Sequence, residues 1–61
     1  MPIVTVQLLE GRTNEQKKAM VEKVTAAVTE TTKASPESVK IIIEEMSKNH
    51  FASAGVLASE K

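Results

Sequence analysis

The sequence lacks several residue types on which small proteins commonly depend. None of its 61 residues is cysteine, so neither disulfides nor a thiolate metal site can stabilise the fold. It has no tryptophan or tyrosine, and its single phenylalanine, Phe51, provides no platform for stacking nucleic-acid bases. A core drawn from so short a chain barely offsets the entropy lost on ordering it. Partner subunits are the remaining source of stability, and we expect an oligomer.

Net charge and long apolar runs are also absent. Eight basic residues balance eight acidic ones, so no long-range field attracts nucleic acid or an anionic membrane. No apolar run approaches transmembrane length, and the first residues lack the charged-then-apolar order of a secretory signal. We expect a single domain over residues 1–61, located in the cytoplasm, with neither nucleic acid nor membrane as a partner.

Two segments are predicted to form β-strands. Residues 2–9, PIVTVQLL, alternate along the chain, so that one face of the strand carries Pro2, Val4, Val6 and Leu8 and the other carries Ile3, Thr5, Gln7 and Leu9. Residues 39–46, VKIIIEEM, are apolar on both faces from Ile41 to Ile43, which predicts burial on two sides.

A helix is predicted between the strands, from residue 14 to residue 33. Thr13 and Gln16 have the spacing of a capping box, and Pro36 ends the helical region. Helical spacing predicts an apolar stripe of Met20, Val24, Ala27, Val28 and Thr31, edged by Val21, with Lys18, Glu22, Thr25 and Thr29 opposite and Lys18–Glu22 as a possible ion pair.

These elements predict an α+β fold in which a β-α-β unit has parallel strands. The helix can cover one face of the two strands, and nothing left in the chain covers the other. A second subunit is the natural cover for that face. The tail, with Gly55 as a turn residue, predicts a short C-terminal hairpin or an arm against a neighbour.

Pro2, directly behind the initiator methionine, is the first candidate for chemistry. A proline at a strand start needs no function, because the missing N–H is tolerated there. Removal of Met1, however, frees a secondary amine that titrates near pH ~8, well below lysine. Desolvation beside Phe51, or a nearby cation, lowers the pKa of such an amine further. It is then suited to act as a general base near neutral pH.

Arg12 and Lys40 are the candidate cations of a site. Arg12 is the only arginine and precedes the helix; its planar guanidinium can pair with both oxygens of a carboxylate. Lys40 lies in the second strand, either as a charge that protects a sheet edge or as a second cation of the site. By residue type alone, Ser38 is expected to be a loop residue and Phe51 a core residue.

The acidic residues do not predict a metal site. Glu44 and Glu45 are adjacent in a strand and therefore point to opposite faces. His50 is the only histidine and cannot form a metal site by itself.

Four segments together resemble the 4-oxalocrotonate tautomerase family. They are Pro2 behind Met1, LLEGRTNEQK at 8–17, SVKIIIEEM at 38–46 and HF at 50–51, in the family's order and spacing over nearly the whole length. The resemblance implies a tautomerase-like subunit assembled as a hexamer of three dimers, with active sites where subunits meet. It also implies an isomerase that uses no metal or cofactor and moves a proton in unsaturated oxo and hydroxy acids, such as 2-hydroxymuconate.

The same resemblance implies roles for individual residues. Pro2 would be the general base, and Arg12, from a neighbouring subunit, would hold a substrate carboxylate. Lys40 stands where relatives carry a second arginine that polarises the 2-oxo oxygen. Phe51 would form an apolar wall that lowers the pKa of the amine. The two remaining positions are substrate contacts, with Leu8 lining the pocket and Ser38 beside the end of the substrate.

Two alternatives stay open at this point. The chain could keep the family's subunit as an oligomeric scaffold or binding module with little turnover. It could also be a promiscuous member whose Pro2 amine adds to carbonyl compounds and forms an iminium. Relatives that hydrate or dehalogenate unsaturated acids carry a carboxylate after the phenylalanine, whereas Ala52-Ser53-Ala54 here contains none. An isomerase is therefore favoured over those activities.

Overall fold

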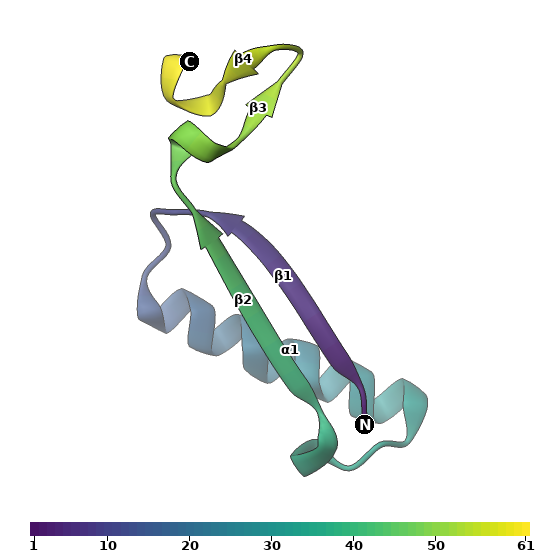
Figure 1. Ribbon diagram of the computed structural model, residues 1–61. Helices are drawn as coiled ribbons and strands as arrows, with labels where there is room; N and C mark the ends of the chain where they lie inside the picture. The colour runs from purple at the N-terminus through teal and green to yellow at the C-terminus, as the bar shows by residue number, and fades with distance from the viewer.

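The structure, a computed structural model, describes residues 1–61 as a β-α-β body with a C-terminal arm (Figure 1). The body comprises β1 (Ile3–Leu9), α1 (Asn14–Thr32) and β2 (Lys40–Met46), with the 3₁₀ turn η1 (Pro36–Ser38) before β2. The arm comprises η2 (Lys48–His50), β3 (Ala52–Ser53), β4 (Val56–Leu57) and η3 (Ala58–Glu60). β1 and β2 pair in parallel, and β3 and β4 form an antiparallel hairpin. The predicted fold class is confirmed.

Helix α1 begins as its local sequence predicts and ends one residue before the predicted boundary. The Thr13 hydroxyl accepts a hydrogen bond from the Gln16 N–H at 3.1 Å, and the Gln16 side chain accepts one from the Thr13 N–H at 2.9 Å. This reciprocal pair is the predicted capping box and satisfies two donors that the helix itself cannot pair. Lys33 closes the helix in the left-handed conformation, with φ of 67°, a position more often occupied by glycine.

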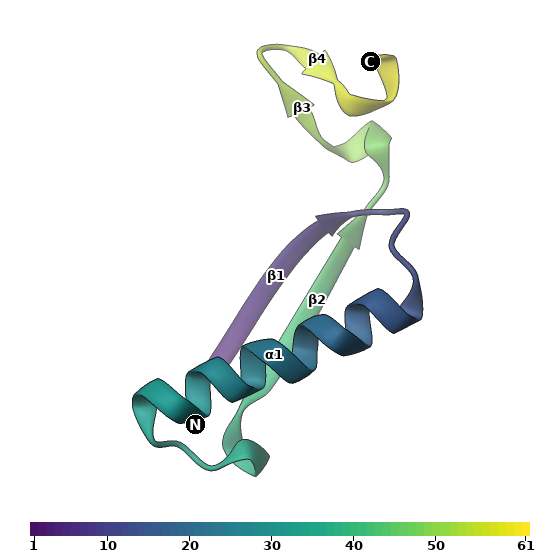
Figure 2. The ribbon, with the colours of Figure 1, turned by 180° about the vertical axis from the view of Figure 1, so that it is seen from behind.

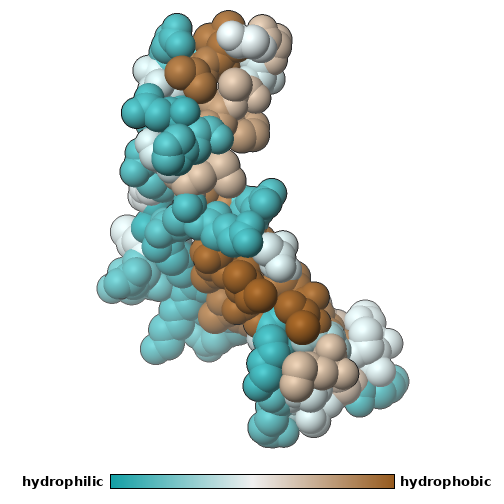
Figure 3. Space-filling view, in the orientation of Figure 1, coloured by the Kyte–Doolittle hydropathy of each residue, from teal (hydrophilic) through white to brown (hydrophobic).

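The two faces of the parallel sheet have different surroundings. Helix α1 covers one face (Figure 2), where Val4 and Val6 of β1 and Ile41 and Ile43 of β2 are half-buried. On the other face Ile3 is 61% exposed and Ile42 is 47% exposed. Figure 3 shows that open face as a hydrophobic patch over the strands. The prediction of a helix on one side and no cover on the other is confirmed.

The buried stripe of α1 is rotated from the predicted one. Its half-buried residues follow helical spacing and are Lys17, Met20, Val21, Val24, Thr25, Val28 and Thr29. Ala27 and Thr31, predicted inside, are exposed, so that prediction is wrong. Thr29 can face the sheet because its hydroxyl donates to the Ala26 carbonyl at 3.0 Å, which leaves its methyl group for packing.

The single chain is extended and has no closed core. No residue is fully buried. The radius of gyration is 14.5 Å, against about 10.5 Å for a compact domain of this length. The accessible surface is 4639 Å², against about 3,900 Å² for a compact monomer of this mass. The excess arises from the arm, which stands away from the body (Figure 1). No helix in the structure is both long and apolar enough to cross a membrane.

Candidate active site

The amino end of the parallel sheet brings together three of the predicted site residues. The Pro2 carbonyl accepts a hydrogen bond from the Lys40 N–H at 2.9 Å, so the starts of β1 and β2 are joined. The Lys40 ammonium donates to the Glu37 carbonyl at 3.2 Å and is thereby held over η1. The Ser38 hydroxyl donates to the Ser35 carbonyl at 2.8 Å. Pro2, Ser38 and Lys40 therefore form one group.

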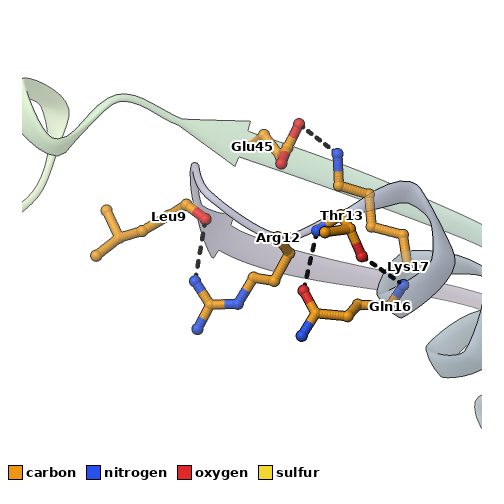
Figure 4. Close-up of polar contacts among 6 residues, drawn as sticks. All are labelled: Leu9, Arg12, Thr13, Gln16, Lys17 and Glu45. Atoms are coloured by element: carbon orange, nitrogen blue, oxygen red, sulfur yellow. Dashed lines mark hydrogen bonds and ion pairs between the residues drawn. The ribbon is translucent and has the colours of Figure 1, made fainter.

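Arg12 lies at the opposite, carboxyl end of the sheet. Gly11 before it has φ of 122°, a conformation that side chains disfavour. The guanidinium Nη1 of Arg12 donates to the Leu9 carbonyl at 3.2 Å (Figure 4). The capping box that starts α1 follows at once and fixes the other side of the loop. The guanidinium is exposed and keeps further donors available for an anion.

An ion pair joins the start of α1 to the end of β2 beside this loop. The Lys17 ammonium lies 2.8 Å from the Glu45 carboxylate (Figure 4). The expected Lys18–Glu22 pair does not form. Neighbours in space rather than along the helix decide which lysine is paired.

Phe51 begins the outer part of the arm, after η2. Its carbonyl accepts a hydrogen bond from the Ala58 N–H at 2.8 Å, which closes the arm on itself. Phe51 is 48% exposed, so its own chain covers it only in part. The expectation that Phe51 walls a pocket stays a prediction that requires another subunit.

Leu8 lies neither with Pro2, Ser38 and Lys40 nor in the Arg12 loop. It has the parity of Val4 and Val6 and is half-buried on the face that α1 covers. Leu9 has the parity of the open face and bears the carbonyl that Arg12 binds. The period-two alternation of β1 is the signal that distinguishes these two leucines. The pocket role of Leu8 stays a prediction, and Leu9 is the residue that the structure brings beside Arg12.

The group of Pro2, Ser38 and Lys40 is too far from Arg12 for both to act on one small molecule within a single chain. β1 separates Pro2 from the Arg12 loop and has seven residues, which span about 23 Å at the usual rise. The single chain also encloses no cavity. A site that contains both Pro2 and Arg12 needs the amino end of one chain and the carboxyl end of another.

The carboxylates near the arm are engaged with neighbours in the body. Glu44 accepts a hydrogen bond from the Gln7 amide at 3.0 Å, and Glu45 pairs with Lys17. No group of three histidine or acidic side chains is positioned to hold a metal ion.

Solved structures with the same fold define the class of this subunit. A crystal structure of a homologue of 4-oxalocrotonate tautomerase superposes with a TM-score of 0.93 at 58% identity, over 98% of each chain. A heterohexameric 4-oxalocrotonate tautomerase from Chloroflexus aurantiacus superposes with a TM-score of 0.93 at 28% identity, over 98% of this chain and 97% of that chain. The fold is that of a small β-α-β subunit of the 4-oxalocrotonate tautomerase type.

Sequence comparisons lead to the same class. The family model described as tautomerase enzyme matches residues 2–61. A Bacillus cereus protein named "Probable tautomerase" is 64% identical over the full length of both chains. A 2-hydroxymuconate tautomerase from Bacillus subtilis is 60% identical over 98% of this chain and 97% of its own. The chain belongs to the tautomerase family.

Proposed function

We propose that this chain is an isomerase that converts 2-hydroxydienoates such as 2-hydroxymuconate to 2-oxo-enoates, with Pro2 as the general base once Met1 is removed. Membership of the tautomerase family supports the isomerase class. The proposed substrate is supported by the 60% identity to a 2-hydroxymuconate tautomerase over nearly the whole length.

The proposed reaction is a proton transfer. The free Pro2 amine accepts the proton of the 2-hydroxyl group, and the oxygen electron pair forms the C2=O bond as the double bonds shift. The amine then returns the proton to the distal carbon of the dienol. No atom or electron is gained or lost, so a base and a stabilised oxyanion suffice and the proposal includes no cofactor.

Arg12 and Phe51 would act from the carboxyl end of another subunit. The guanidinium of Arg12 would pair with a carboxylate of the substrate through two parallel hydrogen bonds. The Phe51 ring would exclude water from the amine, and desolvation disfavours the charged ammonium form. Ser38 would contact the end of the substrate from the Pro2 side, and Leu8 would line the pocket.

Lys40 would be the electrophilic cation beside Pro2. It lies at the same end of the sheet, and its N–H is bonded to the Pro2 carbonyl. A lysine retains the positive charge but not the planar fork of an arginine. We therefore expect weaker stabilisation of the developing 2-oxo oxygen than an arginine gives.

The functional unit would be a homo-oligomer, with a hexamer of three dimers as the expected form. The uncovered Ile3 and Ile42 and the separation of Pro2 from Arg12 support assembly. A heterohexameric relative with the same fold also supports it. Sedimentation velocity at several protein concentrations measures the assembly directly.

The test compares two preparations distinguished by intact mass, one with Met1 retained and one with Pro2 at the terminus. Ketonisation of 2-hydroxymuconate is followed by absorbance at equal protein concentration. We expect activity only in the form with free Pro2, because an amide nitrogen is not a base. Equal activity in both forms would exclude Pro2 as the base.

Inactivity of both forms would overturn the proposed substrate and leave the fold unaffected. Borohydride trapping with pyruvate or an aldehyde would then reveal iminium chemistry at Pro2. Absence of trapping together with an intact oligomer would favour the scaffold.

A further inference from the structure

Glu10 lies at the junction of the body and the arm, and it contacts both. Its backbone N–H donates to the Met46 carbonyl at 2.8 Å, which extends the β1–β2 ladder by one step. Its carboxylate Oε2 accepts a hydrogen bond from the backbone N–H of Lys48, at 3.4 Å. Lys48 is the first residue of η2 and therefore the root of the arm.

Apart from two hydrogen bonds to Ser47, donated by the N–H groups of Asn49 and His50, this contact is the only hydrogen bond between the arm and the rest of the chain. Within the arm, η2, β4 and η3 pack against one another. Figure 1 shows that a single stretch of backbone connects them to the end of β2. With the Glu10 carboxylate removed, no hydrogen bond connects the body to the arm.

Glu10 is also two residues before Arg12, in a loop that is fixed on both sides. The Arg12 guanidinium is bonded to the Leu9 carbonyl, and the capping box at Thr13 holds the following residue. The same carboxylate thus joins a rigid loop that bears Arg12 to the root of the arm that bears Phe51. The distance between these two side chains depends on this junction.

We propose that Glu10 is a positioning residue that sets the arm, and with it Phe51, relative to Arg12. The inference rests on the proposed function, because it assumes that Arg12 and Phe51 contact the same substrate. Glu10 touches neither substrate nor base; it acts through the Lys48 N–H. Loosening the arm should weaken binding of the substrate and expose the Pro2 amine to water.

The test uses Glu10→Ala, which removes the acceptor, and Glu10→Gln, which keeps a side-chain carbonyl for the Lys48 N–H. Glu22→Ala is the matched control, since Glu22 is exposed on α1 and its side chain forms no hydrogen bond or ion pair. The measurements are kcat and KM for 2-hydroxymuconate, the pH profile of kcat/KM and amide exchange of Lys48 by NMR. Sedimentation confirms that each variant assembles.

We expect Glu10→Ala to raise KM about fivefold with kcat nearly unchanged, as loss of one modest hydrogen bond predicts. The acidic limb of its pH profile should move to higher pH, because a hydrated amine has a higher pKa. Its Lys48 amide should exchange faster, whereas Glu10→Gln and Glu22→Ala should resemble the unchanged protein in every measurement.

An unchanged KM and pH profile in Glu10→Ala, with the oligomer intact, would overturn the positioning role. Unchanged exchange at Lys48 would overturn the contact itself, whether or not the protein turns over 2-hydroxymuconate. Inactivity of the unchanged protein and of Glu22→Ala would instead reject the proposed function, and Lys48 exchange would still decide whether Glu10 holds the arm.

Discussion

The two ends of the parallel sheet are built in different ways. At the amino end, a backbone hydrogen bond joins Pro2 to Lys40, and the side chains of Ser38 and Lys40 are bonded to carbonyls in or next to η1. At the carboxyl end, Arg12 sits in a fixed loop while Phe51 extends on an arm with one hydrogen bond to the body. The amino end has the candidate base, and the carboxyl end has the arginine proposed to bind a carboxylate. Neither end has both.

The largest expected effect comes from two variants, one that lacks Pro2 and one that lacks Arg12, so that each intact residue lies on a different chain. Pro2→Ala and Arg12→Ala should each lower kcat/KM by about a thousandfold, since one removes the base and the other an anion contact. Mixed oligomers of the two variants should regain activity, because about a quarter of randomly assembled two-chain sites contain both residues. The measurement is ketonisation after joint refolding.

The control for that experiment is each variant refolded by itself, which should stay inactive. If both residues served the same site from one chain, mixing would restore nothing. That outcome would contradict a site shared between subunits.

The next effect concerns the open face that lies between the two ends. Ile42→Glu introduces a charge where we expect a subunit contact, and burial of an unpaired charge is strongly unfavourable. We expect dissociation to smaller species in sedimentation velocity, with loss of activity. Ala27→Glu is the matched control on the exposed side of α1 and should leave assembly unchanged. Equal assembly of both variants would mean that the open face is not the contact.

A smaller effect is expected at the amino end from Lys40→Arg. An arginine can direct two N–H donors at the developing 2-oxo oxygen and should raise kcat/KM by about tenfold. Steady-state ketonisation measures the change. An unchanged or lower kcat/KM would argue against an electrophilic role for Lys40.

The smallest effect is expected in the arm. Ala54 and Gly55 form a two-residue hairpin loop with φ of 53° and 79°, a geometry that favours Asn-Gly. Ala54→Asn should raise the free energy of unfolding by about 0.5–1 kcal/mol, because asparagine tolerates the left-handed conformation better than alanine. Urea denaturation at a fixed protein concentration measures it. No gain would mean that the hairpin opens independently of global unfolding.

The local elements were predictable because their causes lie within a few residues. The alternation of β1, the triple isoleucine of β2 and the Thr13–Gln16 capping box all act over short stretches. The rotation of α1 was not predictable from apolar spacing, since two threonines, Thr25 and Thr29, lie among its half-buried residues.

Contacts between distant residues could not be predicted either. Glu10 and Lys48 are 38 residues apart in the sequence, and neither belongs to a pattern that indicates the other. The pairing of Lys17 with Glu45 instead of Lys18 with Glu22 has the same origin. For the site, the resemblance to the tautomerase family indicated Pro2 and Arg12. The length of β1 adds that one chain cannot bring them together.

The absence of any fully buried residue has a thermodynamic consequence. If the apolar interior exists only between chains, then folding and association are one equilibrium, governed by mass action. The melting temperature should then rise with protein concentration. On dilution, specific activity should fall below a threshold concentration, and the lost activity should return when the protein is concentrated again.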